Sequence, residues 1–324
     1  MTLHRGQTNG VDVSRRPARG SWSLPRTICP PRSAPGYDGT DPDADEGAYG
    51  AHRLKLEASP RGAVVATWMW GSSDRNVRLR VQAAYRPAGQ AWRAARTLTP
   101  APDEAWDPLV GIDAAGNVVL GYDTGRGIRV QRRTARSGWT SPDAVGLPGE
   151  LADVAVAAGG AAMLVSSAEA GIEAVNRQPG GHWRPARLIS PPRSRPFEPA
   201  AVMDSAGDAV VAWGTASRRV RIARRPAAGP WQPSVRIDAA TAALSAGPDL
   251  AADGRGDALV TWVTEGRAVA RYAPAGHPWS PIRNVVPPSS KYLVIGPAQV
   301  LANGDAVVVW ELSGQVQVRR MTAR

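Results

Sequence analysis

Four carboxylates recur at related positions along the chain, and carboxylates are side chains that general acid–base chemistry and cation binding use. Each lies nine or seven residues before a recurring glycine. Because side chains alternate along a strand, these two positions share a strand face. In a chain of net charge +11, carboxylates that converge could bind a cation or act as acid and base, although solvated charge at strand starts is the simpler interpretation. The four are Asp107, Asp153, Glu198 and Asp249.

The recurring glycine belongs to a repeat that occurs six times, which we take as the basis of the fold. We call it the anchor glycine; successive copies lie 44 to 54 residues apart. Six residues after it, four repeats have Trp and one has Tyr. A second tryptophan, here the outer tryptophan, follows 23 to 30 residues after the anchor in five repeats. The anchors are Gly62, Gly116, Gly160, Gly207, Gly256 and Gly304.

Each repeat predicts four short strands. The first begins near a proline such as Pro199, and the second is an apolar run such as A-V-V-A-W. The third alternates, as in V-R-I-A-R, and the fourth starts at the outer tryptophan and carries an arginine. Radial four-stranded blades require this change from apolar inner strands to charged edge strands. The sequence therefore predicts an all-β, six-bladed β-propeller of four-stranded antiparallel blades.

The two ends of the chain suggest how the ring closes. The sixth repeat lacks an outer tryptophan, whereas residues 11–28 match the third and fourth strands of a repeat, with Trp22 at the tryptophan position. We expect this N-terminal segment to close the ring. The alternative is the remnant of a seventh blade, because the C-terminal residues also look like a third strand. We expect a disordered stretch at 1–10, strands completing the last blade at 11–29, an acidic Pro/Gly linker at 30–50 and blades 1–6 at 51–324.

The turns before the outer tryptophans resemble those of the sialidase-like propellers, whose Asp-box lies between the third and fourth strands. They keep the Gly and Trp of that box but lack its Ser and Asp, so the repeats are degenerate. The resemblance implies three carboxylate-binding arginines, a tyrosine nucleophile and an acid. Tyr122 and Tyr272 fall at a packing position and a third-strand position, and we do not expect sialidase activity.

Composition limits the partners. Lys55 and Lys291 are the only lysines, so the basic charge comes from arginines throughout the sequence, and no aromatic platform for nucleic acid accompanies them. Cys29 is the single cysteine and the four histidines are dispersed, so we predict no metal site and no cofactor. No stretch is apolar enough for a signal peptide or a membrane span. We expect a monomer that is cytoplasmic as written, or secreted if the N-terminus is incomplete.

Two tryptophans, Trp70 and Trp106, fall outside both tryptophan positions of the repeat and are candidate contacts for a sugar or a protein. The leading hypothesis is a non-catalytic recognition or scaffold propeller that binds a protein or a glycan through its central funnel and loop face. The alternative is a glycan-active enzyme, a glycosidase or lyase, that uses the carboxylates near the propeller axis.

Overall fold

The computed structural model describes residues 2–5, 11–15, 21, 23–29, 50–71, 79–99, 103–192, 194–239, 243–286 and 293–322. Within these ranges every regular element is a strand, and the strands form seven antiparallel sheets. None of the described residues forms a helix long and apolar enough to span a membrane. The predicted all-β class is confirmed. The chain divides into two compact units, Met1–Val145 and Gly146–Arg324, and each is described by itself.

Unit 1 contains one three-stranded sheet and two four-stranded sheets. The first sheet is built from β1 (Thr2–Arg5), β2 (Val11–Ser14) and β3 (Arg26–Cys29). The second contains β4 (Gly50–Ala58), β5 (Val64–Gly71), β6 (Arg80–Arg86) and β7 (Arg96–Thr97). The third contains β8 (Ala105–Ile112), β9 (Val118–Thr124), β10 (Arg129–Arg133) and β11 (Asp143–Ala144).

Unit 2 contains three four-stranded sheets and a final three-stranded sheet. The first two are β12 (Glu150–Val156), β13 (Ala162–Ala168), β14 (Gly171–Arg177) and β15 (Arg187–Leu188), then β16 (Phe197–Met203), β17 (Ala209–Gly214), β18 (Val220–Arg225) and β19 (Val235–Arg236). The others are β20 (Leu244–Ala252), β21 (Ala258–Thr264), β22 (Arg267–Ala273) and β23 (Arg283–Val286), then β24 (Leu293–Val300), β25 (Ala306–Leu312) and β26 (Gln315–Met321).

The six repeats correspond to the six sheets from β4 to β26. Each anchor glycine lies in the turn between the first and second strands and has a φ between +85° and +95°. A residue with a Cβ atom is strained at such a positive φ, which explains why glycine recurs at this position. At Gly116 the backbone N–H donates to the Asp113 carbonyl at 3.1 Å and closes the turn.

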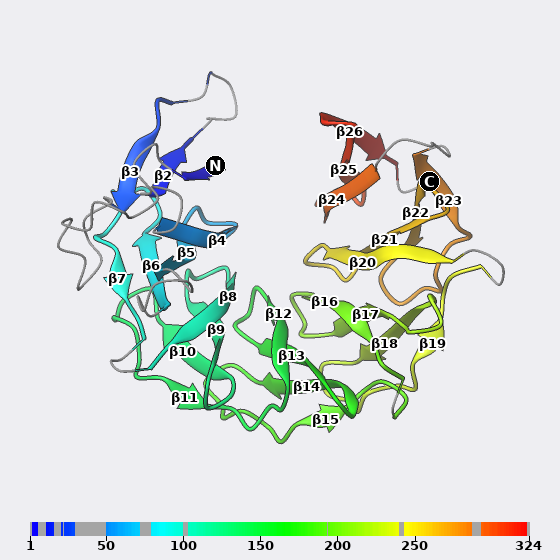
Figure 1. Ribbon diagram of the computed structural model, residues 1–324, viewed down its shortest axis with the longest axis horizontal. Helices are drawn as coiled ribbons and strands as arrows, with labels where there is room; N and C mark the ends of the chain where they lie inside the picture. The colour runs from blue at the N-terminus through cyan, green and yellow to red at the C-terminus, as the bar shows by residue number, and fades with distance from the viewer. Residues whose placement is uncertain are drawn as a thin grey trace, which may run out of the picture. The chain divides into compact units, whose positions relative to one another are not determined.

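Burial follows the gradient that the sequence predicts. All eight residues of β5 are buried, and so are all seven of β21, whereas both residues of β7 and β11 are exposed. In unit 2 the first strands β12, β16, β20 and β24 lie side by side in sequence order (Figure 1). In unit 1, β4 contacts β8 in the same way. The apolar second strands therefore lie between sheets, and the short fourth strands form the edges.

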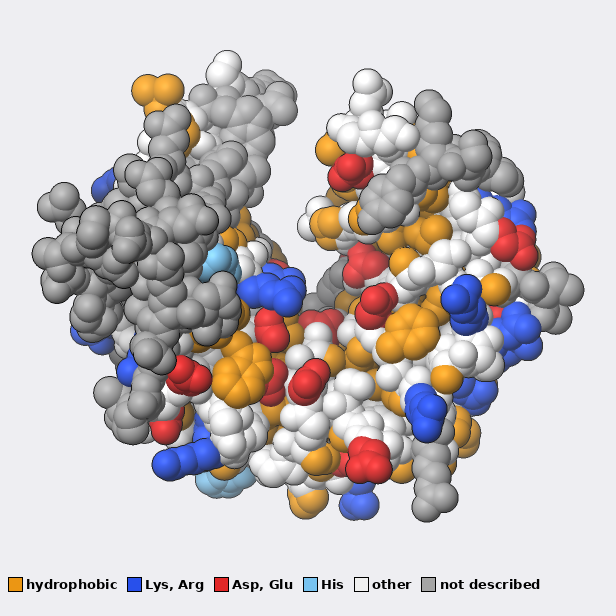
Figure 2. Space-filling model, in the orientation of Figure 1, with side chains coloured by type: hydrophobic (Ala, Val, Ile, Leu, Met, Phe, Trp, Pro, Cys, Tyr) orange, Lys and Arg blue, Asp and Glu red, His pale blue; other side chains and the backbone are white. Residues whose placement is uncertain are grey.

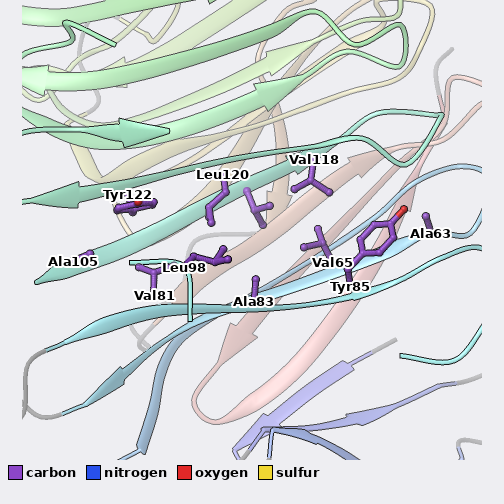
Figure 3. Packing of buried hydrophobic residues seen from close by; sticks show 11 residues of the cluster. Ala63, Val65, Val81, Ala83, Tyr85, Leu98, Ala105, Val118, Leu120 and Tyr122 are labelled. Carbon is purple, nitrogen blue, oxygen red and sulfur yellow. The ribbon is translucent and has the colours of Figure 1, made fainter. Parts of the chain in front are cut away.

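Neighbouring sheets pack through layers of small and aromatic side chains. Between the second and third sheets of unit 1, Val65 and Tyr85 face Val118 and Leu120 (Figure 3). The Tyr85 hydroxyl donates to the Gly116 carbonyl at 3.0 Å. Three of the four tryptophans that lie six residues after an anchor are fully buried in such layers, so they belong to the core; they are Trp68, Trp213 and Trp262.

The N-terminal segment differs in part from the prediction. Thr2–Arg5 form β1 where we predicted disorder, because the edge of β2 offers unpaired backbone groups, and Thr2 pairs with Ser14. β2 and β3 pair as a third and a fourth strand do. The two third-strand-like segments, β2 and β26, belong to separate sheets. Completion of the last blade by residues 11–29 stays a prediction, and Trp22 and residues 30–49 lie outside the described residues.

Candidate functional site

The predicted carboxylates lie on first strands, where the register with the second strand shifts. Asp107 lies inside the shift in β8 and Glu198 inside the shift in β16, and their φ values are +48° and +45°. Asp153 and Asp249 lie where pairing resumes in β12 and β20. A β-bulge of this kind re-aims side chains and leaves backbone groups without a ladder partner. The strict alternation from which we predicted a shared strand face is therefore interrupted.

Two of the carboxylates in unit 2 bind the backbone of the next sheet. Asp153 Oδ2 accepts a hydrogen bond from the Ala201 N–H at 2.7 Å, and Asp249 Oδ2 accepts one from the Ala298 N–H at 2.9 Å. Ala201 and Ala298 each lie six residues before their anchor glycine, so the two bonds are equivalent. Each carboxylate thus supplies an acceptor for a backbone donor on a bulged strand of the neighbouring sheet.

Glu198 makes the corresponding link at the interface between these two. In its sheet Ala200 occupies the position of Asp153 and Asp249, and Glu198 lies two residues earlier. Its Oε2 atom accepts from the Gly247 N–H at 2.5 Å. A Cβ atom on residue 247 would lie 2.2 Å from the same oxygen, so the close approach requires glycine. Three successive interfaces of unit 2 therefore each contain a carboxylate–amide link.

In unit 1, Asp107 is paired with a charged group instead. The Arg53 Nε atom lies 3.2 Å from Asp107 Oδ1, with both side chains exposed to solvent. The Asp107 N–H approaches the Met69 sulfur at 3.2 Å. Because an exposed ion pair contributes little to stability, its main effect is to orient the two bulged strands β4 and β8.

Glu198 and Asp249 line a common groove of about 680 Å³ in unit 2. The groove follows the bulged first strands β16, β20 and β24, and Figure 2 shows acidic and apolar side chains together in this region. Backbone, glycine and aliphatic groups supply most of its surface. The other lining residues are Ser245, Ala246, Gly247, Val263, Gly266, Leu293, Val294, Ile295, Gly296 and Pro297.

The two candidate tryptophans have different environments. Trp70 is 5% exposed and packs in a cluster with Trp68, Val11 and Cys29, so its indole helps join β5 to the N-terminal sheet. Trp106 is half-buried on β8, opposite Asp123 in the register. The apolar run that ends in Trp70, interrupted only by Thr67, was the signal for its burial. Among the described residues, no three His, Cys, Asp or Glu side chains gather in a way that could hold a metal ion.

Sequence reasoning placed the carboxylates on first strands but missed their amide partners. The partner lies 48 or 49 residues away, about one repeat, and belongs to the neighbouring sheet. No local sequence pattern predicts a hydrogen bond between such distant residues. The sequence offered one signal for it: the separation between carboxylate and amide is about equal to the length of one repeat.

Removing a carboxylate–amide link should destabilise unit 2. Asp153→Ala leaves the Ala201 N–H without its acceptor, and we expect the free energy of unfolding to fall by about 1–3 kcal/mol. Asp153→Asn retains one carbonyl oxygen for the Ala201 N–H but loses the acceptor of the Val154 N–H, so we expect a loss that is smaller than that of the alanine variant. Urea denaturation followed by circular dichroism measures both variants. Equal losses for Ala and Asn would show that the acceptor oxygen is unimportant.

Comparison with known proteins identifies the fold. No protein-family model matches the sequence, and no curated protein matches it. Solved structures do match. The BP39L lectin from Burkholderia pseudomallei has a TM-score of 0.63 at 13% identity, covering 99% of this chain and 93% of the lectin. Virginiamycin B lyase from Staphylococcus aureus has a TM-score of 0.56 at 11% identity, covering 99% of this chain and 94% of the lyase.

The NanB sialidase from Streptococcus pneumoniae has a TM-score of 0.54 at 11% identity. This match covers 85% of this chain and 68% of the sialidase chain. At such identities the likeness shows the fold alone. The chain is a β-propeller. The resemblance to sialidases that the repeat turns suggested is confirmed at the level of this fold, which these structures share with a lectin and a lyase.

Proposed function

We propose that this propeller is a non-catalytic recognition module that binds a glycan or a protein through the groove over β16, β20 and β24. The observation that carries the proposal is the use of Glu198 and Asp249 in that groove. Each already accepts a hydrogen bond from the backbone of the next sheet, which fixes its oxygen in a structural contact. Carboxylates held in this way define the shape of a binding surface.

The alternative glycan-active enzyme would need a different arrangement. A general acid and a general base must both reach one substrate, and their environments must separate their pKa values. Glu198 and Asp249 lie on neighbouring sheets and are oriented by two separate amides, Gly247 and Ala298. Asp107 belongs to unit 1 and is paired with Arg53. These contacts favour recognition over acid–base chemistry.

The chemistry of the groove suits a glycan. The Glu198 carboxylate can accept hydrogen bonds from hydroxyl groups, and backbone groups in the bulged strands can donate and accept. Aliphatic side chains such as Val294 and Ile295 offer an apolar surface for the face of a sugar ring. An extended peptide could use the same backbone groups, so a protein ligand is included in the proposal.

A glycan-array screen of the full chain at low and physiological salt tests this function. We expect selective binding that persists at physiological salt. Ala246→Arg should fill the groove and weaken binding at least tenfold, because Ala246 is exposed and lines it. Ala228→Arg adds the same charge at an exposed site that does not line the groove and should leave binding unchanged.

Two results would contradict the proposal. Binding of every polyanion that disappears at physiological salt would indicate general attraction to the basic surface. Turnover of a bound glycan that is lost in both Glu198→Gln and Asp249→Asn would indicate the enzyme. Retained binding in these two variants supports recognition.

A further inference from the structure

A second pocket, of about 290 Å³, lies between the sheets β16–β19 and β20–β23 of unit 2. Val202 and Val210 form part of its lining, and because they pair in the register they share one strand face. Both pack against the apolar cluster between the two sheets. Charged side chains complete the lining and decide which ligand the pocket suits. They are Asp204, Asp208, Arg224, Arg225 and Arg255.

Three of these charged side chains already have partners in the protein. Arg225 is buried and donates to three backbone carbonyl groups. Arg255 forms ion pairs with Asp253 and Asp257. Asp208 accepts a hydrogen bond from a backbone N–H at 2.6 Å and is exposed. The chemistry of the pocket therefore depends on the remaining carboxylate and the remaining guanidinium.

The remaining carboxylate, that of Asp204, is only 7% exposed. Its Oδ1 atom accepts hydrogen bonds from the N–H groups of residues 206, 207 and 208 at 2.8 to 2.9 Å. Among the described residues none donates to Oδ2. A Cβ atom on Gly256 would lie 2.8 Å from Oδ2, and Gly256 lines the same pocket, so Oδ2 is directed into it. A carboxylate oxygen at this depth requires a donor.

The remaining guanidinium, that of Arg224, lies on the same strand face, because Arg224 pairs with Val210. It is 4.9 Å from the centre of the Trp279 ring and donates to the His277 carbonyl at a long 3.4 Å. Within the described ranges it forms no ion pair. Burial lowers the pKa of the Arg224 guanidinium, because the charged form loses solvation. An anion in the pocket would compensate for this loss.

The second repeat has an acid and an arginine at the same two positions, and there both have partners. Asp113 Oδ2 accepts from Asn117 Nδ2 at 2.7 Å, and Arg132 lies 3.6 Å from the Asp143 carboxylate. In the fourth repeat Asp208 replaces Asn117, and a carboxylate has no hydrogen to donate. The need for a donor and for an anion is therefore a property of this pocket and not of the repeat.

We propose that this pocket binds a small zwitterion, an α-amino acid with an apolar side chain. The ammonium group donates to Asp204 Oδ2, the carboxylate accepts from the Arg224 guanidinium, and the side chain lies against Val202 and Val210. Hydrogen bonds between opposite charges are stronger than neutral ones. A pocket of this volume suits a small molecule. It shares no lining residue with the groove over β16, β20 and β24, so it is an additional site.

Isothermal titration calorimetry of the full chain with L-valine, L-leucine and L-phenylalanine tests the site. We expect saturable binding of at least one of them. The α-hydroxy acid analogue lacks the ammonium group, and the amide analogue lacks the carboxylate. Each should bind at least tenfold more weakly, because each loses one charged contact. Binding of none of the three amino acids, or equal binding of either analogue, would overturn the proposal.

Asp204→Asn keeps an oxygen for the turn amides and removes the charge. Affinity for the amino acid should fall at least tenfold, whereas affinity for the α-hydroxy acid should change less than twofold. Asp113→Asn is the matched control at the same position of the second repeat, outside the pocket, and should leave binding unchanged. Equal losses for the two ligands in Asp204→Asn would contradict an ammonium site at Asp204.

Arg224→Gln removes the guanidinium and should weaken binding of the amino acid at least tenfold, with less than a twofold change for the amide. Arg132→Gln, at the same position of the second repeat, is its control and should leave binding unchanged. A merely structural role of Arg224 predicts equal losses for acid and amide. That result would overturn the assignment of the carboxylate to Arg224.

Discussion

Replacing Trp213 with alanine is expected to lower the free energy of unfolding by about 3–5 kcal/mol. The side chain is fully buried in the cluster between the sheets β12–β15 and β16–β19, where Met163 and Val211 are also fully buried. Removing the indole leaves a cavity that close-packed strands can fill only in part. Chemical denaturation followed by circular dichroism measures the loss.

The control for this prediction is Trp231→Ala. Trp231 packs against the same cluster but is half-buried in a turn, so we expect a loss of about 1–2 kcal/mol. The comparison separates the core position from the outer position of the repeat. Equal losses at the two sites would mean that burial does not distinguish them.

Gly247→Ala is expected to destabilise unit 2 by about 1–3 kcal/mol, because overpacking forces neighbouring groups to move. The new Cβ would lie 2.2 Å from Glu198 Oε2 and 2.4 Å from Glu198 Cβ. The clash involves the base of the glutamate side chain, so rotation of its carboxylate alone does not relieve it. The same change should weaken ligand binding in the groove, since both residues line it.

A second substitution makes this prediction specific. Glu198→Gly removes both clashing atoms and suits the backbone, since φ at this position is +45°. Glu198→Gly also removes the acceptor of the residue 247 N–H, so the double variant should be about as stable as Glu198→Gly alone, and a double-mutant cycle should show strong coupling. Additive losses would show that the contact between residues 198 and 247 is not the cause.

The sequence by itself determined the repeat architecture. The spacing of six residues between an anchor glycine and Trp213 or Trp262 lies within one turn and one strand, so local chain geometry fixes which residues are buried. The positive φ of the turn requires glycine, which makes the repeat visible. Strand alternation likewise predicted the exposed edges. Such features depend only on residues that are close in the sequence, so they can be recognised in the sequence of one chain.

Only the tertiary structure decided what the candidate residues contact. The bulges in β8 and β16 interrupt the alternation on which the prediction for Asp107 and Glu198 relied. The acceptors for Ala201 and Ala298 come from the preceding repeat, so their identity depends on how sheets stack. Trp70 is buried because the N-terminal strands pack on it. Tyr272 and Met321, 49 residues apart, line one cavity, and such a contact between sheets follows from packing rather than from local pattern.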